Sequence, residues 1–193
     1  MASELPLRVA YRLPEWVRDV APPPGTLVPS DEERMRLTIR LAEENVRRRT
    51  GGPFGAAVFR RSDGALVAVG VNRVETERCS LLHGEVMAIA LAERALGAFT
   101  LDEPPIPPHE LVTSCEPCAM CLGAAFWSGV RRIVCGAQRE DAMALGFDEG
   151  PVSEDSYAYL AARGIEVVRG VLREEAAAVL RLYRDLGGGI YNP

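Results

Sequence analysis

The chain has 193 residues, a length that suits one domain and allows a substantial hydrophobic core. Hydrophobic residues make up 48% of it and charged residues 25%, and no apolar run approaches the roughly 20 residues that span a membrane. The net charge is -5, so the chain is a poor candidate for binding the phosphate backbone of a nucleic acid. The first ten residues carry an acid early and lack an apolar core, so they do not indicate a secretory signal. We therefore expect a cytoplasmic protein.

The N-terminal part is expected to differ from the rest. Residues 1–29 are rich in proline and predict an extended arm rather than a domain. A helix is predicted to begin after Ser30, because Ser30 and Glu33 fit a capping box and apolar residues follow at helical spacing. Glycines at 51 and 52, followed by a proline, end that helix.

From this helix onward, strands and helices alternate. Two strands, 56–60 and 65–71, flank a turn signal at 62–64 and predict a hairpin. The remaining predicted elements are, in chain order, a helix over 83–96, a strand over 111–114, a helix over 117–128, strands over 133–137 and 165–168, and a helix over 174–186. This alternation predicts one layered α/β domain over residues 30–193. His109 follows two prolines and is expected to be an ordinary surface residue in a loop.

The cysteines raise the question of metal binding or redox chemistry. There are five, at positions 79, 115, 118, 121 and 135, and three of them fall within seven residues. A disulfide scaffold is not favoured, because no secretion signal is indicated. Cys79 and Cys135 are expected to be small buried or loop residues.

Two short motifs together indicate a catalytic zinc site. H-G-E occupies 83–85 and P-C-A-M-C occupies 117–121, a pattern typical of zinc-dependent deaminases. A catalytic zinc needs three protein ligands and one open position, and His83, Cys118 and Cys121 supply the three. Both motifs lie at predicted helix starts, where unpaired amides and the helix dipole favour thiolates. Glu85 can then take the proton of the water that zinc activates.

Two other metal sites are less consistent with the sequence. Cys115, Cys118 and Cys121 also spell C-x-x-C-x-x-C, which resembles part of an iron–sulfur run. Such a run needs a fourth cysteine soon after, and 122–134 contains none. A structural zinc finger needs four closed ligands, and the chain has only two histidines.

Longer blocks of sequence resemble one family. G-G-P-F-G-A (51–56), T-S-C-E-P-C-A-M-C-L-G-A (113–124) and G-F-D-E-G-P (146–151) resemble the guanine deaminase branch of the cytidine deaminase-like superfamily. The similarity covers most of 45–193, including I-Y-N at 190–192. It implies a three-layer α/β/α fold with a mixed five-stranded sheet and one zinc ion per subunit. It also implies a homodimer, with the C-terminal segment near an active site as a lid.

The same resemblance implies further site residues. Substrate contacts are implied for Asn72, Phe54, Trp127, Phe147, Ser114 and Tyr191. Glu149 lies where the branch has a second active-site carboxylate, 28 positions after Cys121. Guanine offers its N1–H and 2-amino group as donors, and an ionised carboxylate accepts from both. A second carboxylate could also relay the proton that a departing amine must gain.

The resulting hypothesis is hydrolysis of guanine to xanthine and ammonia, a step of purine catabolism. Guanosine and the aminotriazine ammeline remain alternatives, because they present a similar edge to Glu149. A tRNA adenosine deaminase is disfavoured by the acidic charge, and a cytosine deaminase is also less favoured. A catalytically silent, zinc-stabilised scaffold is a non-enzyme alternative, which the presence of Glu85 argues against. Gly84 replaces the alanine usual in H-A-E, so we expect slightly looser local structure without lost chemistry.

Overall fold

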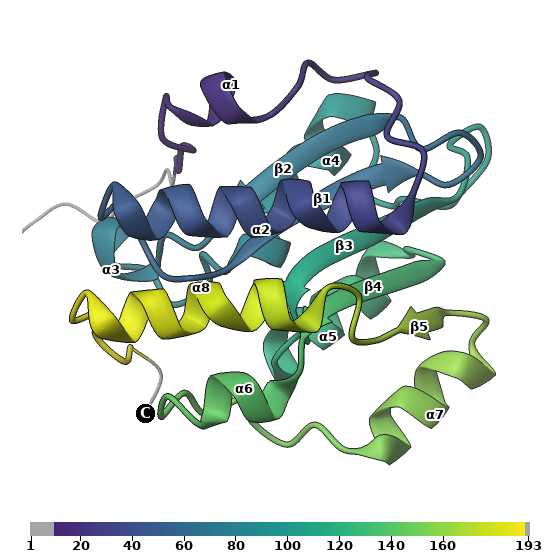
Figure 1. Cartoon of the computed structure of the whole chain (residues 1–193). Coiled ribbons are helices and arrows are strands. Elements are labelled where there is room, and N and C mark those ends of the chain that lie inside the picture. The colour runs from purple at the N-terminus through teal and green to yellow at the C-terminus, as the bar shows by residue number, and fades with distance from the viewer. Residues whose placement is uncertain (1–9, 192–193) are drawn as a thin grey trace, which may run out of the picture.

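The computed structural model describes residues 10–191, which form one sheet with helices on both faces (Figure 1). The strands are β1 (Gly55–Arg60), β2 (Leu66–Val71), β3 (His109–Cys115), β4 (Arg132–Ala137) and β5 (Glu166–Val168). Their order is β2-β1-β3-β4-β5. β1 pairs antiparallel with β2 and β3, whereas β3, β4 and β5 run parallel. The predicted mixed five-stranded sheet is therefore confirmed.

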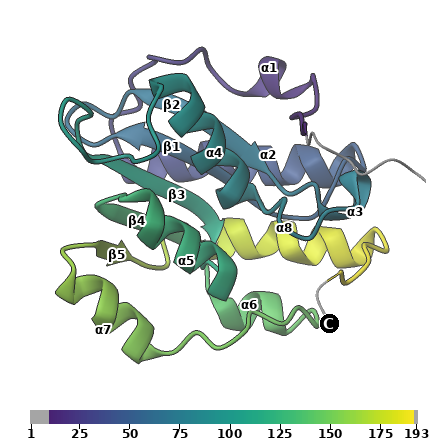
Figure 2. The same cartoon turned by 180° about the vertical axis from the view of Figure 1, so that it is seen from behind.

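The helices are α1 (Val17–Val20), α2 (Asp31–Arg47), α3 (Val74–Glu77), α4 (Gly84–Leu96), α5 (Ala119–Ser128), α6 (Arg139–Met143), α7 (Glu154–Ala162) and α8 (Arg173–Asp185). α2 and α8 cover one face of the sheet, and α4 and α5 cover the other (Figures 1 and 2). Each face has its own apolar cluster. The three predicted layers are thus confirmed. Within residues 10–191, no helix combines the length and the apolar character that crossing a membrane requires.

Helix α2 forms for the reasons that its sequence indicates. The Ser30 hydroxyl accepts from the Glu33 amide at 3.2 Å, and the Glu33 carboxylate accepts from the Ser30 amide at 3.3 Å. This reciprocal pair satisfies two amides that the helix start leaves unpaired. The apolar stripe of α2 is buried against the sheet.

The N-terminal segment packs on its own chain. Within residues 10–29, Trp16 is buried in the apolar cluster on the face of the sheet that α2 and α8 cover. Its indole N–H donates to the Thr50 hydroxyl at 3.1 Å. Leu27 forms an antiparallel bridge with Ala65, beside the outer edge of β2. Residues 1–9 of the predicted arm lie outside the described residues.

The structure differs from the sequence-based expectations at His109 and in the helices α1, α3, α6 and α7, which were not predicted. His109 was expected at the surface, which is wrong: it is the first residue of β3, almost fully buried, and its Nδ1 lies 2.9 Å from the Leu101 carbonyl oxygen. The prolines before it end a loop that returns into the sheet. Helix α7 was not predicted, because only Tyr157 and Leu160 of its nine residues are buried and no apolar stripe marks it.

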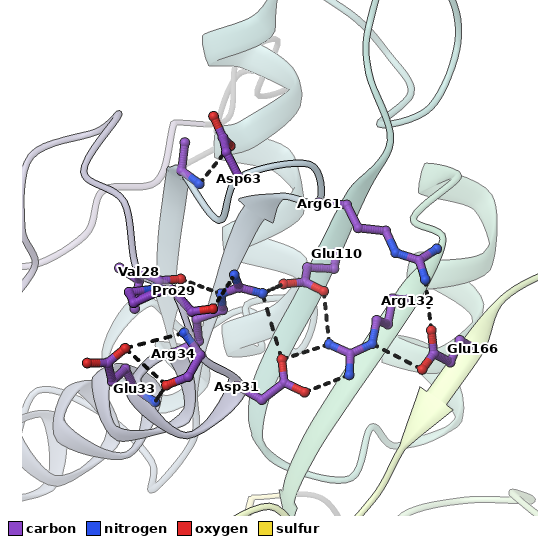
Figure 3. A network of polar contacts seen from close by, with 12 residues as sticks. Val28, Pro29, Asp31, Glu33, Arg34, Arg61, Asp63, Glu110, Arg132 and Glu166 are labelled. Atoms are coloured by element: carbon purple, nitrogen blue, oxygen red, sulfur yellow. Dashed lines mark hydrogen bonds and ion pairs between the residues drawn. The ribbon is translucent and has the colours of Figure 1, made fainter.

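An ion-pair network joins α2 to three strands (Figure 3). Glu110, at the start of β3, is 1% exposed and accepts hydrogen bonds from Arg34 of α2 and Arg132 of β4. Arg132 also donates to both oxygens of Asp31, at 2.8 and 2.6 Å, and lies 3.3 Å from Glu166 of β5. The network fastens one end of the sheet, opposite the carboxyl end of β3.

Removing the central carboxylate should strongly destabilise the fold. We expect Glu110→Ala to lower the free energy of unfolding by about 3–5 kcal/mol, because the buried guanidinium of Arg34 and the partly buried one of Arg132 both lose a partner. Urea denaturation measures this. Glu32→Ala, which removes an exposed partner of Arg36, should change it by less than about 0.5 kcal/mol. Equal losses in the two variants would contradict the central role of Glu110.

Asp31 should make stability depend on pH. The hydrogen bonds from Arg132 lower the pKa of the Asp31 carboxyl below its ordinary value. Because the folded pKa lies below the unfolded one, the pair adds stability above about pH 4 and loses it as pH falls through the folded pKa. The difference in unfolding free energy between wild type and Asp31→Asn should therefore be constant from about pH 7 to about pH 5 and shrink below about pH 4. A difference that persisted undiminished in stronger acid would refute the assignment.

Candidate active site

Two helix starts meet beside the carboxyl end of β3. His83 is the N-cap residue of α4, and Cys118 is the N-cap residue of α5. Pro117 precedes Cys118 and keeps the chain extended after β3 until the helix begins. The amides of both first turns and the two helix dipoles therefore favour negative charge at this place.

The donor atoms of three predicted ligands lie together. His83 Nδ1 is 3.6 Å from Cys118 Sγ and 3.5 Å from Cys121 Sγ, and all three atoms lie within 4.8 Å of one another. Tetrahedral zinc, with bonds of about 2.3 Å to sulfur and about 2.0 Å to nitrogen, separates such atoms by about 3.5 Å. The side chains thus fit zinc through one nitrogen and two sulfurs.

The two thiols shift each other's pKa in opposite directions. Hydrogen bonds from Cys121 and His83 lower the pKa of Cys118 to about 4, despite its burial. The hydrogen bond to Cys118, together with burial, raises the pKa of Cys121 well above its ordinary value. Zinc provides the positive charge that both thiolates need.

Glu85 lies on the first turn of α4, two residues after His83. Its side chain is buried, and one carboxylate oxygen accepts from the Thr113 hydroxyl of β3 at 3.3 Å. Burial, followed by the negative charge of Cys118, raises the pKa of Glu85. This carboxyl can therefore hold a proton more readily than a solvated glutamate.

Glu149 is a second buried carboxyl at the same place. It is 6% exposed, and its backbone carbonyl accepts from the Ala119 amide at the start of α5, at 2.9 Å. Burial, and then the charges of Cys118 and Glu85, raise its pKa to about 8. A group of this kind can both bind and release a proton near neutral pH.

Aromatic rings line the site next to these carboxyls. The Phe147 ring lies 5.2 Å from the rings of both Phe54 and Tyr191, measured between centroids. The Tyr191 ring is in turn 6.4 Å from the imidazole of His83. Phe54 precedes β1, Phe147 follows α6 and Tyr191 follows α8, so three distant segments converge. Asn192, named with Tyr191 in the expected lid, lies outside the described residues.

Two buried polar groups have no partner here. Within residues 10–191, neither the Asn72 side-chain Nδ2 nor the Tyr191 hydroxyl has a hydrogen-bond partner. The rest of Asn72 is fully engaged: its amide donates to Phe54, its side-chain oxygen accepts from Val74, and its carbonyl accepts from Asn45. Unpaired buried polar groups are rare in proteins, so these two are suited to meeting a ligand.

Two predicted residues lie differently. Trp127 is 80% exposed on α5, where its ring contacts Phe126. Ser114 is buried, but its hydroxyl already accepts from the Gly55 amide at 3.0 Å and so joins β3 to β1. Sequence reasoning missed Thr113 and Asn45; a polar residue inside the apolar stripe of α2 was the available signal for Asn45.

The donor set predicts one zinc ion per chain. We expect Cys121→Ala to lower the zinc content of the purified protein to a small fraction, because one of three ligands is lost. Cys115→Ala should retain it, since the buried Cys115 thiol contacts the Gln138 carbonyl instead. Elemental analysis after dialysis measures both. Loss of metal from Cys115→Ala would favour the three-cysteine arrangement.

Comparisons with known proteins agree with this geometry. The family model of the cytidine and deoxycytidylate deaminase zinc-binding region matches residues 28–137. Guanine deaminase of Bacillus subtilis (strain 168) is 42% identical over 118 residues, which cover 61% of this chain and 71% of the relative.

Two solved structures match nearly the whole chain. One of guanine deaminase from Nitrosomonas europaea is 42% identical, with a TM-score of 0.88, and covers 95% of this chain and 100% of that one. Another, a variant in complex with 8-azaguanine, gives the same identity and TM-score and covers 95% and 99%. The chain therefore belongs to the cytidine and deoxycytidylate deaminase family and is a zinc-dependent hydrolytic deaminase.

Proposed function

We propose that the chain hydrolyses guanine to xanthine and ammonia, as a step of purine catabolism. The observation that carries the proposal is the buried Glu149 carboxyl beside Glu85 and the zinc ligands. Its support from outside the chain is the similarity to two proteins described as guanine deaminases and to a structure that holds 8-azaguanine.

In this proposal, guanine packs against the aromatic wall that the Phe54 and Phe147 rings form together. Ionised Glu149 accepts from its N1–H and 2-amino group, a two-donor edge that adenine and cytosine do not present in the same arrangement. Burial, and then the negative charge of Cys118, raise the pKa of Glu149; a bound cation offsets the charge of Cys118 and favours the ionised form of Glu149. Asn72 Nδ2 donates to an acceptor of the purine, which gives this amide its missing partner.

The reaction needs two proton movements. Zinc held by His83, Cys118 and Cys121 would lower the pKa of a water towards about 7. Glu85 takes a proton from this water and delivers it to N3 of the base, while the water oxygen bonds to C2. Glu85, ionised again, takes the second proton from the new C2 hydroxyl and, aided by Glu149, passes it to the 2-amino nitrogen. The C2–N bond then breaks as the C2–O double bond forms, so ammonia leaves and xanthine remains.

A substrate panel tests the proposal. Ammonia release from guanine should exceed that from guanosine, ammeline, adenine and cytosine, measured on zinc-replete protein. Glu85→Gln should retain zinc and lose about 10²- to 10⁴-fold in kcat, because the proton carrier is gone. Faster turnover of ammeline or guanosine would reassign the substrate within the same chemistry. Near-normal kcat in Glu85→Gln would disprove the mechanism.

Glu149 should decide which base is accepted. We expect Glu149→Gln to lower kcat/KM for guanine by about 10²-fold or more. The glutamine side chain has one acceptor oxygen and one donor NH2 group, so it cannot accept hydrogen bonds from both donors of guanine with two oxygens, as the carboxylate does. Asp148→Asn is the matched control: the Asp148 side-chain oxygen accepts from the Gly150 amide, which an asparagine oxygen can also do. Steady-state kinetics measure both variants. Equal, small effects would remove Glu149 from substrate recognition.

We also infer a cytoplasmic homodimer. None of the five cysteines, which all lie within the described residues, forms a disulfide, as a reducing compartment favours. Phe126, Trp127 and Tyr159 form an aromatic patch on α5 and α7, with Trp127 and Tyr159 exposed; such patches are typical of protein interfaces. Light scattering tests the assembly: a monomeric mass for the wild type would contradict it.

A further inference from the structure

Glu116 is a buried carboxylate that the proposed mechanism does not use. It lies directly after β3, two residues before the zinc ligand Cys118, and is almost fully buried. Burying a carboxylate is costly unless charged and hydrogen-bonded partners compensate for the lost water. The partners of the Glu116 carboxylate therefore identify the segments that this residue holds together.

Three later segments of the chain donate to this one carboxylate. Arg169, just after β5, donates to both of its oxygens. The Tyr157 hydroxyl of α7 donates at 3.2 Å, and the backbone amide of Arg139, the first residue of α6, donates at 3.4 Å. Burial, and then the nearby carboxylate, raise the pKa of Tyr157, so its hydroxyl remains a donor. The Arg169 guanidinium also lies over the Tyr157 ring, 4.8 Å from its centroid.

These contacts leave little freedom for the second zinc-binding motif. The Glu116 backbone amide donates to the Ala137 carbonyl of β4 at 2.9 Å, so main chain and side chain are both held. Only Pro117 and Cys118 separate Glu116 from the first residue of α5. Proline fixes one backbone angle of this short link. The direction in which Cys118 presents its sulfur thus depends on how Glu116 is held.

The same cluster reaches the segment that carries Glu149. The Arg139 guanidinium donates to the Val152 carbonyl at 2.6 Å, and the Ala119 amide donates to the Glu149 carbonyl at 2.9 Å. Residues 149–152 are thus held at two points, one on α5 and one on α6.

We propose that Glu116 is a positioning residue for the zinc site: its carboxylate, clamped by Arg169, Tyr157 and the Arg139 amide, sets the placement of Cys118 at the start of α5. Its effect on metal binding is separate from its contribution to stability. Outer partners of this kind typically contribute 10- to 100-fold to metal affinity.

The chain offers a matched control on the same strand. Glu110 is equally buried, accepts from two arginines and lies at the other end of β3, away from the zinc ligands. Glu116→Gln and Glu110→Gln both keep the side-chain shape and remove a buried charge. Zinc affinity is measured by competition with a colorimetric chelator, at a temperature at which circular dichroism shows both variants folded. The visible absorption of the cobalt-substituted proteins reports ligand geometry.

We expect Glu116→Gln to weaken zinc binding by about 10- to 100-fold and to alter the cobalt spectrum, whereas Glu110→Gln leaves both close to wild type. Wild-type affinity and spectrum in folded Glu116→Gln would overturn the proposal. So would an equal loss of zinc affinity in the two variants, which would indicate general loosening.

If Glu116→Gln does not fold, Tyr157→Phe decides, because it removes one donor and keeps the ring. Its control is Tyr159→Phe, an exposed tyrosine on the same helix. Weaker zinc binding in Tyr157→Phe alone supports the proposal, and wild-type affinity overturns it.

Discussion

One geometric constraint organises this fold: a histidine nitrogen must come within 4.8 Å of two cysteine sulfurs that lie 35 and 38 residues further along the chain. The first turns of α4 and α5 therefore have to approach each other closely beside β3. Helix α4 must also lie close against the sheet, and Gly70 of β2 provides the room: a Cβ at this position would lie 2.1 Å from the Gly84 carbonyl oxygen and 2.5 Å from the Ala88 amide nitrogen. A side chain at position 70 would push the start of α4, and His83 with it, away from the sheet.

Strand β3 carries the polar side chains on which this arrangement depends. Glu110 links the start of β3 to α2 and β4. Glu116, directly after β3, links the other end of the strand to α6, α7 and the segment after β5. Between them, Thr113 donates to Glu85 and Ser114 accepts from β1. A central strand is buried on both faces, so its polar groups need partners within the protein. Here those partners are the segments that build the site.

The sequence was sufficient for features whose cause is local. The capping box at Ser30, the hairpin of β1 and β2, and the two zinc-binding motifs at helix starts each depend on neighbouring residues alone. His109 and α7 could not be obtained in this way. The burial of His109 depends on a loop folding back towards Leu101, and α7 packs on the rest of the chain through Tyr157, whose partner Glu116 lies 41 residues away.

Within the candidate site too, some residues could be identified from local sequence and others depend on distant parts of the chain. His83, Cys118, Cys121 and Glu85 follow from motif spacing and the coordination chemistry of zinc. The position of Glu149 beside them was anticipated only from family resemblance, because its burial depends on how the segment after α6 returns to α5. Resemblance also gave Trp127, which lies exposed on α5. A residue's place in a motif does not determine which way its side chain faces once the helix is packed.

A chain of hydrogen bonds also runs from the N-terminal segment to the loop that holds Asn72. Trp16 donates to Thr50, Thr50 donates to Asn45 at 2.8 Å, and Asn45 donates to the carbonyls of Gly52 and Asn72 at 2.9 and 2.8 Å. Docking of Trp16 and ordering of the Asn72 backbone therefore share one buried amide. Thermodynamic linkage makes such a coupling reciprocal. A ligand that orders the Asn72 loop strengthens the docking of the N-terminal segment by the same factor by which that docking strengthens the ligand's binding.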